Sequence, residues 1–548
     1  MADDLDRRCT GLFHKPDIVQ CTDSTHRIRV LRRFDQPNSL FIRLFADGTE
    51  ISITKSLIPE CIQILFVQKG DTAMRQEDNK TLTGTGPGTP AGDWMRLYWQ
   101  PVALSEELDT DRAAVPVRVL GEDLVLFRNE DLSLGLIDRR CAHRGADLSL
   151  GRLEDGGLRC YFHGWLFEGS GQCLQTPAEP DDSPLASKVK IKSYPVVERN
   201  GIMWGYLGTE TPPKLPALDC FAAPEDYTFA FKGFLDCNWL QALEVGIDPA
   251  HASYLHRFEN DEDTEDGYGK QFRNASLGTD LPMTKILREY SRPEISNART
   301  EYGQRIVALR TLDKDGLDGS STHVRISHQV FPHGITIPLS STIAITQWHV
   351  PIDDTSCYWY AMFTSLDEPV DKELMRAQRI DAITLPDYKP VRNRANQYQF
   401  DAEEQRTETY TGLGKDINAH DQMAVEGQGY IYDRSREHLS RSDRAIVTYR
   451  RMVLSAIEAV AEGRSPHTLL TDTAEVESRG PIPLDGIGPT GEWESYWAQS
   501  IADLRKASPW ASELVAALTT GPAGIPGSPT EPDRSQSTDA YDRTDTKD

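Results

Sequence analysis

Short apolar runs, broken by Gly, Asp and Asn, occupy the chain between residues 115 and 197. These runs lie at 115–121, 124–131, 134–140 and 158–168. Their length and spacing are typical of strands in a small antiparallel β domain. From about Gly201 longer strand-like runs alternate with helical stretches, and these runs lie at 229–237, 322–331, 341–350 and 357–366. The pattern predicts an α+β protein in which a small β domain precedes a larger one.

The clearest helical period lies late in the larger domain. Apolar residues recur there with the spacing of one helix face, at 446, 447, 453, 454, 457 and 460. Ser442 precedes this stretch and Gly463 follows it. We therefore expect a helix with Ser442 as its N-cap and Gly463 at its end.

The first 73 residues differ from the rest of the chain. They show neither alternation nor a helical period, apart from an apolar run at 62–67 that could form one short strand. The residues Lys69, Gly70 and Asp71 can be encoded by purine-rich codons that resemble a ribosome-binding sequence. Our hypothesis is that Met74 is the natural start and that 1–73 is misassigned upstream sequence. The alternative is a genuine N-terminal extension.

The remaining chain of this 548-residue protein is long enough for two domains. We expect the β domain at 74–200, with a helical lead-in, and the larger domain at 201–505. Residues 506–548 form a C-terminal segment that is rich in Gly, Pro, Ser and Asp after Pro522. That composition is typical of a disordered tail.

Composition and charge exclude several kinds of partner. The formal net charge of −25 repels nucleic acid and anionic membranes. There is no run of eighteen or more apolar residues and no signal-peptide pattern at the start, so we expect a cytoplasmic protein without a membrane span. The nine cysteines are odd in number and irregularly spaced, which does not suggest a disulfide framework. Reduced thiols are therefore available as metal ligands.

A first group of candidate metal ligands lies in the β domain. Cys141 and His143 form a C-x-H pair, and Cys160 and His163 form a C-x-x-H pair after sixteen intervening residues. A structural zinc site is one interpretation, although zinc fingers usually pair Cys with Cys and His with His. One Cys and one His in each loop suit a two-iron cluster with thiolates on one iron and imidazoles on the other. We interpret Cys173 as a small buried core residue.

A second group begins at Asp248-x-x-His251-x-x-x-x-His256. Two His and one carboxylate suit non-haem Fe(II) and leave open coordination positions. On an unbroken helix two residues five apart diverge by about 140°, so both His can bind one metal only if the helix is interrupted. Pro249 favours such an interruption. The alternative is a pair of ordinary, partly buried histidines.

The third ligand must come from elsewhere in the chain. The segment 412–443 contains four candidate carboxylates, Asp416, Asp421, Glu426 and Asp433. Residue chemistry and spacing alone leave these four open.

The motifs together resemble those of a known family. The CAHRGA and C-x-x-HGW loops are similar to the Rieske domain of bacterial aromatic-ring-hydroxylating oxygenases. The segment from Asn238 to His256 matches N-W-x-Q-x-x-E-x-x-x-D-x-x-H-x-x-x-x-H, and the late D…GQG…DRSRE segment resembles the phthalate dioxygenase-like branch. The resemblance covers roughly residues 75–505. It indicates the alpha (oxygenase) subunit of a Rieske non-haem iron oxygenase, whose catalytic domain has a curved antiparallel sheet flanked by helices (helix-grip, START-like).

The resemblance also implies roles for individual residues. Cys141 and Cys160 would bind one iron of a Rieske [2Fe–2S] cluster, and His143 and His163 the other. His251, His256 and Asp421 would hold a mononuclear Fe(II). Asp248 would bridge to a cluster histidine of a neighbouring subunit in a homo-trimer or a stack of trimers. Glu244 lies where the family often has Asn or Glu near the iron.

The implied function is oxidation of a small aromatic, carboxylated substrate with O2, in the catabolism of aromatic compounds. The sequence shows no Rossmann-type dinucleotide-binding unit and no flavin or plant-type ferredoxin motif, so electrons from NAD(P)H are expected through a separate flavin and iron–sulfur reductase. One alternative is a Rieske monooxygenase acting as an O- or N-demethylase. Another is a Rieske electron-transfer protein without oxygenase activity.

Candidate pocket residues stay open at this point. An aromatic acid needs a cation in its pocket, and the candidates in predicted strands are Arg273, Arg288, Arg305, Arg310 and Arg325. The same region contains His323, His328, His333 and His349, most of which we interpret as strand histidines with a partner in the protein.

Overall fold

The computed structural model describes residues 74–108, 114–216, 218–259, 277–278, 281–314, 317–466 and 480–511, together with the backbone of four strands near the N-terminus. The chain divides into two compact units, Met1–Asp71 and Thr72–Asp548. The first unit holds an antiparallel sheet of β1 (Ile18–Thr22), β2 (Arg27–Arg33), β3 (Leu40–Ala46) and β4 (Thr49–Lys55), in this order. The sequence pattern of 1–73 did not predict these strands. The run at 62–67 and the tail after Pro522 lie outside the described residues.

The second unit begins with the expected helical lead-in, α2 (Gln76–Thr83) and α3 (Pro90–Met95). The small β domain that follows contains three sheets. The first runs β13 (Ser193–Tyr194), β8 (Leu134–Asp138), β7 (Glu122–Arg128), β6 (Ala114–Val119), and the second β14 (Val196–Arg199), β15 (Ile202–Tyr206), β5 (Trp99–Leu104). The predicted runs at 115–121, 124–131 and 134–140 are therefore strands.

The third sheet corrects one prediction. It runs β12 (Cys173–Gln175), β11 (Leu166–Phe167), β10 (Gly157–Arg159), β9 (Arg152–Glu154). The run at 158–168 is thus two short strands separated by a loop, because residues 160–165 turn the chain back on itself. Cys173 is buried in the core of this domain, as expected.

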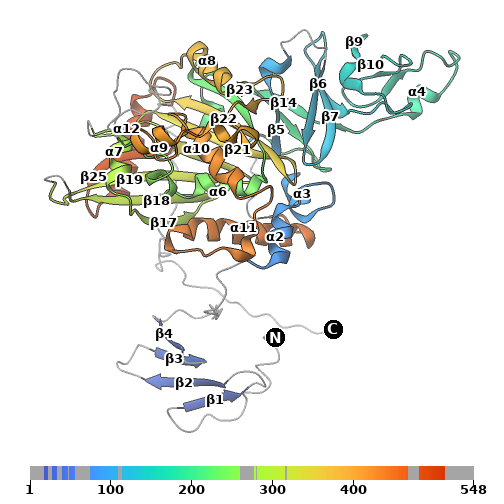
Figure 1. Ribbon diagram of the computed structural model, residues 1–548. Helices are drawn as coiled ribbons and strands as arrows, with labels where there is room; N and C mark the ends of the chain where they lie inside the picture. The colour runs from blue at the N-terminus through green and yellow to red at the C-terminus, as the bar shows by residue number, and fades with distance from the viewer. Residues whose placement is uncertain are drawn as a thin grey trace, which may run out of the picture. The chain divides into compact units, whose positions relative to one another are not determined.

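The larger domain is built on an eight-stranded antiparallel sheet (Figure 1). Its order is β16 (Thr228–Leu235), β22 (Ser356–Ser365), β21 (Ile343–Asp353), β20 (Gly334–Pro338), β19 (Ser321–Val330), β18 (Gly303–Leu312), β17 (Glu294–Arg299), with β25 (Leu484–Pro489) paired to β19. Strands were predicted at four of these places. The α+β fold class, with a small β domain before a larger domain of antiparallel sheet and helices, is confirmed.

Three helices of the larger domain matter for the site: α6 (Trp239–Ile247), α10 (Ile417–Gly427) and α11 (Arg444–Ala461). Helix α11 is the helix predicted from the late apolar period. Its predicted N-cap is wrong, because Ser442 lies inside a 3₁₀ turn (Arg441–Asp443) whose N-cap side chain is that of Ser440. No helix in the described part of the chain is long and apolar enough to cross a membrane.

One hydrophobic core joins the small and the larger domain. Leu124 and Leu136 of the small domain belong to the same buried cluster as Ile335 and Trp348 of the larger sheet. The loops that carry Cys141 and Cys160 pack on a separate, smaller core. Burial of the shared core fixes the small domain on the larger one, since apolar contact is the main stabilising interaction between them.

Candidate metal centres

The two Cys–His loops, residues 141–146 and 160–165, fold as the same turn. In each loop the cysteine N–H donates to the carbonyl oxygen five residues later, and the N–H of the glycine four residues later donates to the cysteine carbonyl. These bonds are Cys141 N to Ala146 O at 2.9 Å, Gly145 N to Cys141 O at 2.8 Å, Cys160 N to Trp165 O at 2.8 Å and Gly164 N to Cys160 O at 3.0 Å. Gly145 and Gly164 have φ of 71° and 73°, a left-handed conformation that favours glycine. The glycine four residues after each cysteine therefore sets the shape of both loops.

The four candidate cluster ligands converge between these loops. Cys141 and Cys160 are buried, and their thiols lie close enough to interact directly. The ring centroids of His143 and His163 are 4.5 Å apart. Trp165 stacks on His143 at 4.7 Å, with 4° between the ring planes. Trp165 therefore orients one imidazole and covers one side of the site.

The donor set fits a Rieske-type [2Fe–2S] cluster. Burial and, to a smaller extent, the neighbouring Cys160 raise the pKa of the Cys141 thiol to about 11. Two adjacent thiolates in this apolar surrounding need the compensating charge of a metal. The Nδ1 of His163 is buried and has no hydrogen-bond partner among the described residues. The chain thus offers two thiolates to one iron and two imidazoles to the other.

Two arginines hold the loops in place. The Nη2 of Arg139 lies 2.6 Å from Oδ2 of Asp147, just after the first loop. The Nη1 of Arg159 donates to the carbonyl of Gly164 in the second loop at 2.8 Å. Arg139 holds the pKa of Asp147 down at about 2. Asp147 is therefore ionised and the ion pair is present at neutral pH.

The second candidate centre begins where α6 ends. The helix ends at Ile247, and Asp248 is its C-cap in an extended conformation. The Oδ1 of Asp248 accepts from the N–H of Ala250 at 2.7 Å, and a 3₁₀ turn (His251–Ser253) follows. This interruption is the one that the five-residue spacing of His251 and His256 requires. Their Nε2 atoms lie 3.2 Å apart.

Asp421 joins these histidines from helix α10. Its Oδ1 lies 3.2 Å from Nε2 of His256 and 3.8 Å from Nε2 of His251. The three ligand atoms all lie within 4.8 Å of one another. In the described part of the chain, no other three His, Cys, Asp or Glu side chains bring their ligand atoms this close together. The structure therefore brings His251, His256 and Asp421 together.

The local chemistry of these residues fits a metal ion. The backbone carbonyl of Asp248 accepts a hydrogen bond from Nδ1 of His251, which leaves Nε2 with its lone pair toward Asp421. Burial lowers the pKa of His251, so its ring is neutral. The Oδ1 of Asp421 is buried and makes no hydrogen bond to any residue that the structure describes. A cation between these atoms supplies the missing partner, and two imidazoles with one carboxylate form the facial triad of non-haem Fe(II).

The other three carboxylates have different partners. Asp416 caps α10 by accepting from the N–H of Asn418 at 3.1 Å. Glu426 accepts from the hydroxyl of Tyr398 at 2.8 Å. Asp433 caps a 3₁₀ turn (Arg434–Arg436). Of the four carboxylates that the sequence left open, the structure places Asp421 beside the histidines.

Glu244 lies in a buried ion-pair cluster. Its Oε1 accepts from Nε of Arg450 at 2.6 Å, and its Oε2 accepts from Nη2 of Arg434 at 3.0 Å. Arg450 also pairs with Glu437. The structure does not bring the carboxylate of Glu244 into the group of His251, His256 and Asp421.

Family models match both parts of the chain. The Rieske [2Fe-2S] domain model matches residues 98–195, and the model described as LigXa C-terminal domain like matches residues 205–503. The chain belongs to the Rieske non-haem iron oxygenase family. As a Rieske oxygenase it carries a [2Fe–2S] cluster and a mononuclear iron, and it takes electrons that originate in a reductase.

Two relatives in sequence support the oxygenase assignment. This Rieske oxygenase is 34% identical to the phthalate 4,5-dioxygenase oxygenase subunit of Pseudomonas putida, over 79% of this chain and 97% of the relative. It is 31% identical to the 5,5'-dehydrodivanillate O-demethylase oxygenase subunit of a Sphingobium strain, over 78% of this chain and 89% of the relative. The structure of NdmA from Pseudomonas putida CBB5 with caffeine matches with a TM-score of 0.48 and 18% identity, over 69% of this chain and 95% of that one.

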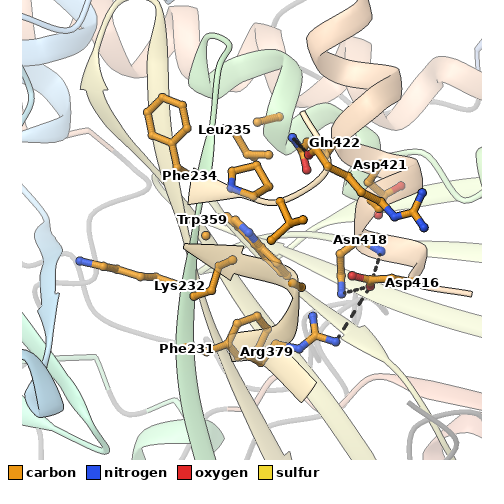
Figure 2. Close-up of a pocket in the computed structure, with 18 of the residues that line it drawn as sticks. Phe231, Lys232, Phe234, Leu235, Trp359, Arg379, Asp416, Asn418, Asp421 and Gln422 are labelled. Atoms are coloured by element: carbon orange, nitrogen blue, oxygen red, sulfur yellow. Dashed lines mark hydrogen bonds and ion pairs between the residues drawn. The ribbon is translucent and has the colours of Figure 1, made fainter. Parts of the chain in front are cut away.

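A cavity of about 350 Å³ reaches Asp421 of this Rieske oxygenase (Figure 2). Its walls are mostly apolar and come from β16, β21, β22, α10 and the helix α8 (Lys372–Ala382). Phe231, Leu235 and Trp359 are among its apolar lining residues. The size and lining are those of a pocket for a small organic molecule.

The positively charged side chains that line this cavity are not the arginines proposed from the sequence. Arg288, Arg305, Arg310 and Arg325 are not among its lining residues, and Arg273 lies outside the described residues. Its arginines are instead Arg379 and Arg392, and it also contains Lys232. Sequence reasoning missed Arg379 because α8 is a surface-type amphipathic helix without a motif, and only tertiary packing places this residue at the cavity.

Proposed function

We propose that this chain is the oxygenase component of a multicomponent Rieske oxygenase that hydroxylates a small aromatic carboxylate. Electrons come from NAD(P)H through a separate reductase. The observation that carries this proposal is the cavity of about 350 Å³ whose wall includes Asp421. Its aromatic and aliphatic lining suits a ring, and the guanidinium of Arg379 suits a carboxylate. The relative named for phthalate 4,5-dioxygenase supports the same substrate class.

Arg379 is well suited to an anion in an apolar pocket. It is 9% exposed, its guanidinium carbon lies 5.2 Å from the ring centroid of Phe231, and its ion pair with Asp416 is long, at 4.0 Å. Figure 2 shows Arg379, Asp416 and Asn418 together on one side of the cavity. Asp416 is already engaged in capping α10, so a substrate carboxylate can pair with Arg379 without displacing that cap.

The residues of the chain orient the reacting partners. His251, His256 and Asp421 would hold the mononuclear iron, which activates O2 with electrons that the cluster supplies. Asp248 fixes the tautomer of His251 through its carbonyl, while Glu244 anchors α6 through Arg434 and Arg450. We assign Glu244 as a positioning residue, since its oxygens face arginines. The apolar wall of the cavity excludes water from the substrate ring.

We propose a homo-trimer, single or stacked, in which the cluster of one subunit reduces the iron of the next. Strands β9 and β10 lie apart from α6 and α10 within one chain (Figure 1). His143 is exposed, and Tyr161 and Phe162, which precede His163, are 55% and 51% exposed. An exposed ligand next to exposed aromatic rings suits a protein contact. Asp248, which is half-buried, would receive a cluster histidine of the neighbouring subunit.

A second candidate reaction is O-demethylation. The 31% identity to a dehydrodivanillate O-demethylase oxygenase subunit favours it, and the same cavity accommodates a methoxylated aromatic acid. An electron-transfer protein without oxygenase activity is the third candidate. It would need only the two irons of the cluster, whereas an oxygenase needs three per chain.

Turnover under labelled oxygen tests these proposals. The full chain, a reductase and NADH are incubated with ¹⁸O2 and a panel of aromatic acids. Two labelled oxygens in the product indicate dioxygenation, one indicates monooxygenation, and release of formaldehyde from a methoxylated acid indicates demethylation. Reductase-dependent NADH oxidation without a labelled product from any acid would contradict the proposed function.

A further inference from the structure

Four histidines lie on the strands of the larger sheet or in the turn between β19 and β20, and one of them differs from the rest. Nε2 of His323 lies 3.1 Å from Asp485, Nδ1 of His328 lies 2.9 Å from the hydroxyl of Tyr302, and Nε2 of His333 lies 2.7 Å from Oε1 of Gln100. His349 on β21 is only 4% exposed, yet neither of its ring nitrogens has a hydrogen-bond partner among the described residues. Three of these histidines therefore have a partner in the protein, as expected, and His349 does not.

A buried imidazole without partners is unfavourable. Removing a polar group from water without a compensating hydrogen bond costs free energy, and few buried side-chain polar atoms in native proteins lack a partner. Such a group calls for a partner outside the protein chain, a water or a ligand. The surroundings of His349 indicate whether this partner is a water or a ligand.

His349 lines the cavity that contains Asp421. Gln347, two residues earlier on the same face of β21, lines it as well, and Trp359 is the cross-strand neighbour of His349 on β22. The ring of His349 is neutral, because burial lowers its pKa to about 3 although Asp421 opposes the shift. A neutral imidazole has one N–H donor and one acceptor nitrogen. At the wall of an otherwise largely apolar pocket, His349 therefore has one donor and one acceptor without a partner among the described residues.

We propose that His349 is the residue that hydrogen-bonds an oxygen substituent of the aromatic substrate: a carboxylate, hydroxyl or methoxyl group. This inference rests on the proposed function and deepens it. Arg379 supplies a positive charge that attracts an anionic group, and His349 supplies a hydrogen bond that is directional. A substrate without the oxygen leaves the imidazole unpaired, so His349 makes the pocket reject plain hydrocarbons.

Binding to two matched ligands tests the inference. Iron-loaded full chain is titrated calorimetrically, without O2 or reductase, with 3-chlorobenzoate and with chlorobenzene, which differ only in the carboxylate. In His349→Leu we expect affinity for 3-chlorobenzoate to fall about 5–15-fold, the loss of one hydrogen bond, while affinity for chlorobenzene stays equal or rises. His349→Gln, which keeps a donor and an acceptor, restores most of the affinity for 3-chlorobenzoate.

Thermal unfolding of the ligand-free protein gives a readout that needs no ligand. Replacing an unpaired His349 by Leu should leave Tm unchanged or raise it by a few degrees. His328→Leu is the matched control, because His328 is equally buried but bonded to Tyr302. His328→Leu removes this hydrogen bond from the hydroxyl of Tyr302, so Tm should fall by several degrees.

Several outcomes would overturn the inference. An equal loss of affinity for both ligands, or no loss for either, would show that His349 does not hydrogen-bond the oxygen substituent. A drop in Tm for His349→Leu as large as that for His328→Leu would show a structural role. If the wild type binds none of phthalate, 3-chlorobenzoate and 4-hydroxy-3-methoxybenzoate, the substrate class is wrong and the inference fails. Absent turnover with intact, His349-dependent binding would instead count against the oxygenase proposal alone.

Discussion

The carboxylate oxygen Oδ1 of Asp421 lies 3.2 Å from Nε2 of His256, although one residue is on α10 and the other follows α6. This oxygen is buried and has no hydrogen-bond donor among the described residues. A buried carboxylate is stable in such a place only when a cation or a donor faces it. The pair therefore marks the point where two separate segments of the chain meet around a metal.

Asp421→Ala should remove the mononuclear iron and turnover and keep the cluster. We expect iron content to fall from about three to about two per chain, since the cluster holds two irons and the triad one. The visible spectrum of the cluster should not change. Asp416→Ala is the control, because it removes a helix cap and the long ion pair with Arg379 but none of the three proposed ligands, and it should keep all the iron. Retained activity in Asp421→Ala would move the third ligand to Asp416 or Glu426.

Cys160→Ala should have the opposite effect. Without one of the two thiolates the cluster is lost, so its visible absorption disappears while mononuclear iron remains at about one per chain. Cys173→Ala is the control, since Cys173 is a buried core residue outside the loops, and it should keep the spectrum. Loss of the spectrum in Cys173→Ala alone would contradict the ligand assignment.

The site could be predicted from the sequence to the extent that its ligands are local. The Cys–His loops and the His251–His256 segment each bring their ligands together within a few residues, so spacing indicated them as candidates, with a zinc site and ordinary histidines as the alternatives. Asp421 needed the family resemblance, because Asp416, Glu426 and Asp433 are equivalent in local sequence. Arg379 and His349 could not be ranked, since a helix and a strand far apart in sequence place them at one cavity. The N-terminal strands were missed, although Ile28 and Val30 in β2 and Ile51 and Ile53 in β4 alternate with polar residues.

Glu244→Gln should destabilise the protein strongly. The substitution leaves Arg434 and Arg450 buried without their common carboxylate, and breaking a buried ion pair costs about 3–5 kcal/mol. Denaturant unfolding of the full chain measures the loss. Glu403→Gln removes one partner of an exposed pair with Arg406 and should leave stability unchanged. Equal stability of both variants would contradict the structural role of Glu244.

The Arg139–Asp147 pair should make the cluster domain sensitive to acid. The pKa of Asp147 is about 2 in the folded chain and about 3.9 when unfolded. A lowered carboxyl pKa stabilises the fold above pH 4, and this contribution is lost as the pH falls through 2. Because Asp147 is partly exposed, we expect about 1–2 kcal/mol at neutral pH.

Asp147→Asn measures this contribution. The difference in unfolding free energy between wild type and Asp147→Asn should be present at pH 7 and shrink between pH 4 and pH 2. A difference that stays constant over this range would show that the carboxylate charge does not contribute.

A single turnover of the reduced chain tests the two-centre oxygenase most directly. The full chain is reduced chemically, freed of reductant, and mixed with ¹⁸O2 and phthalate or 3-chlorobenzoate. We predict a product labelled with ¹⁸O from the wild type and none from Asp421→Ala, although the cluster of the variant is equally reduced at the start. Oxidation of the cluster without labelled product in the wild type, or equal labelling by both proteins, would contradict this account.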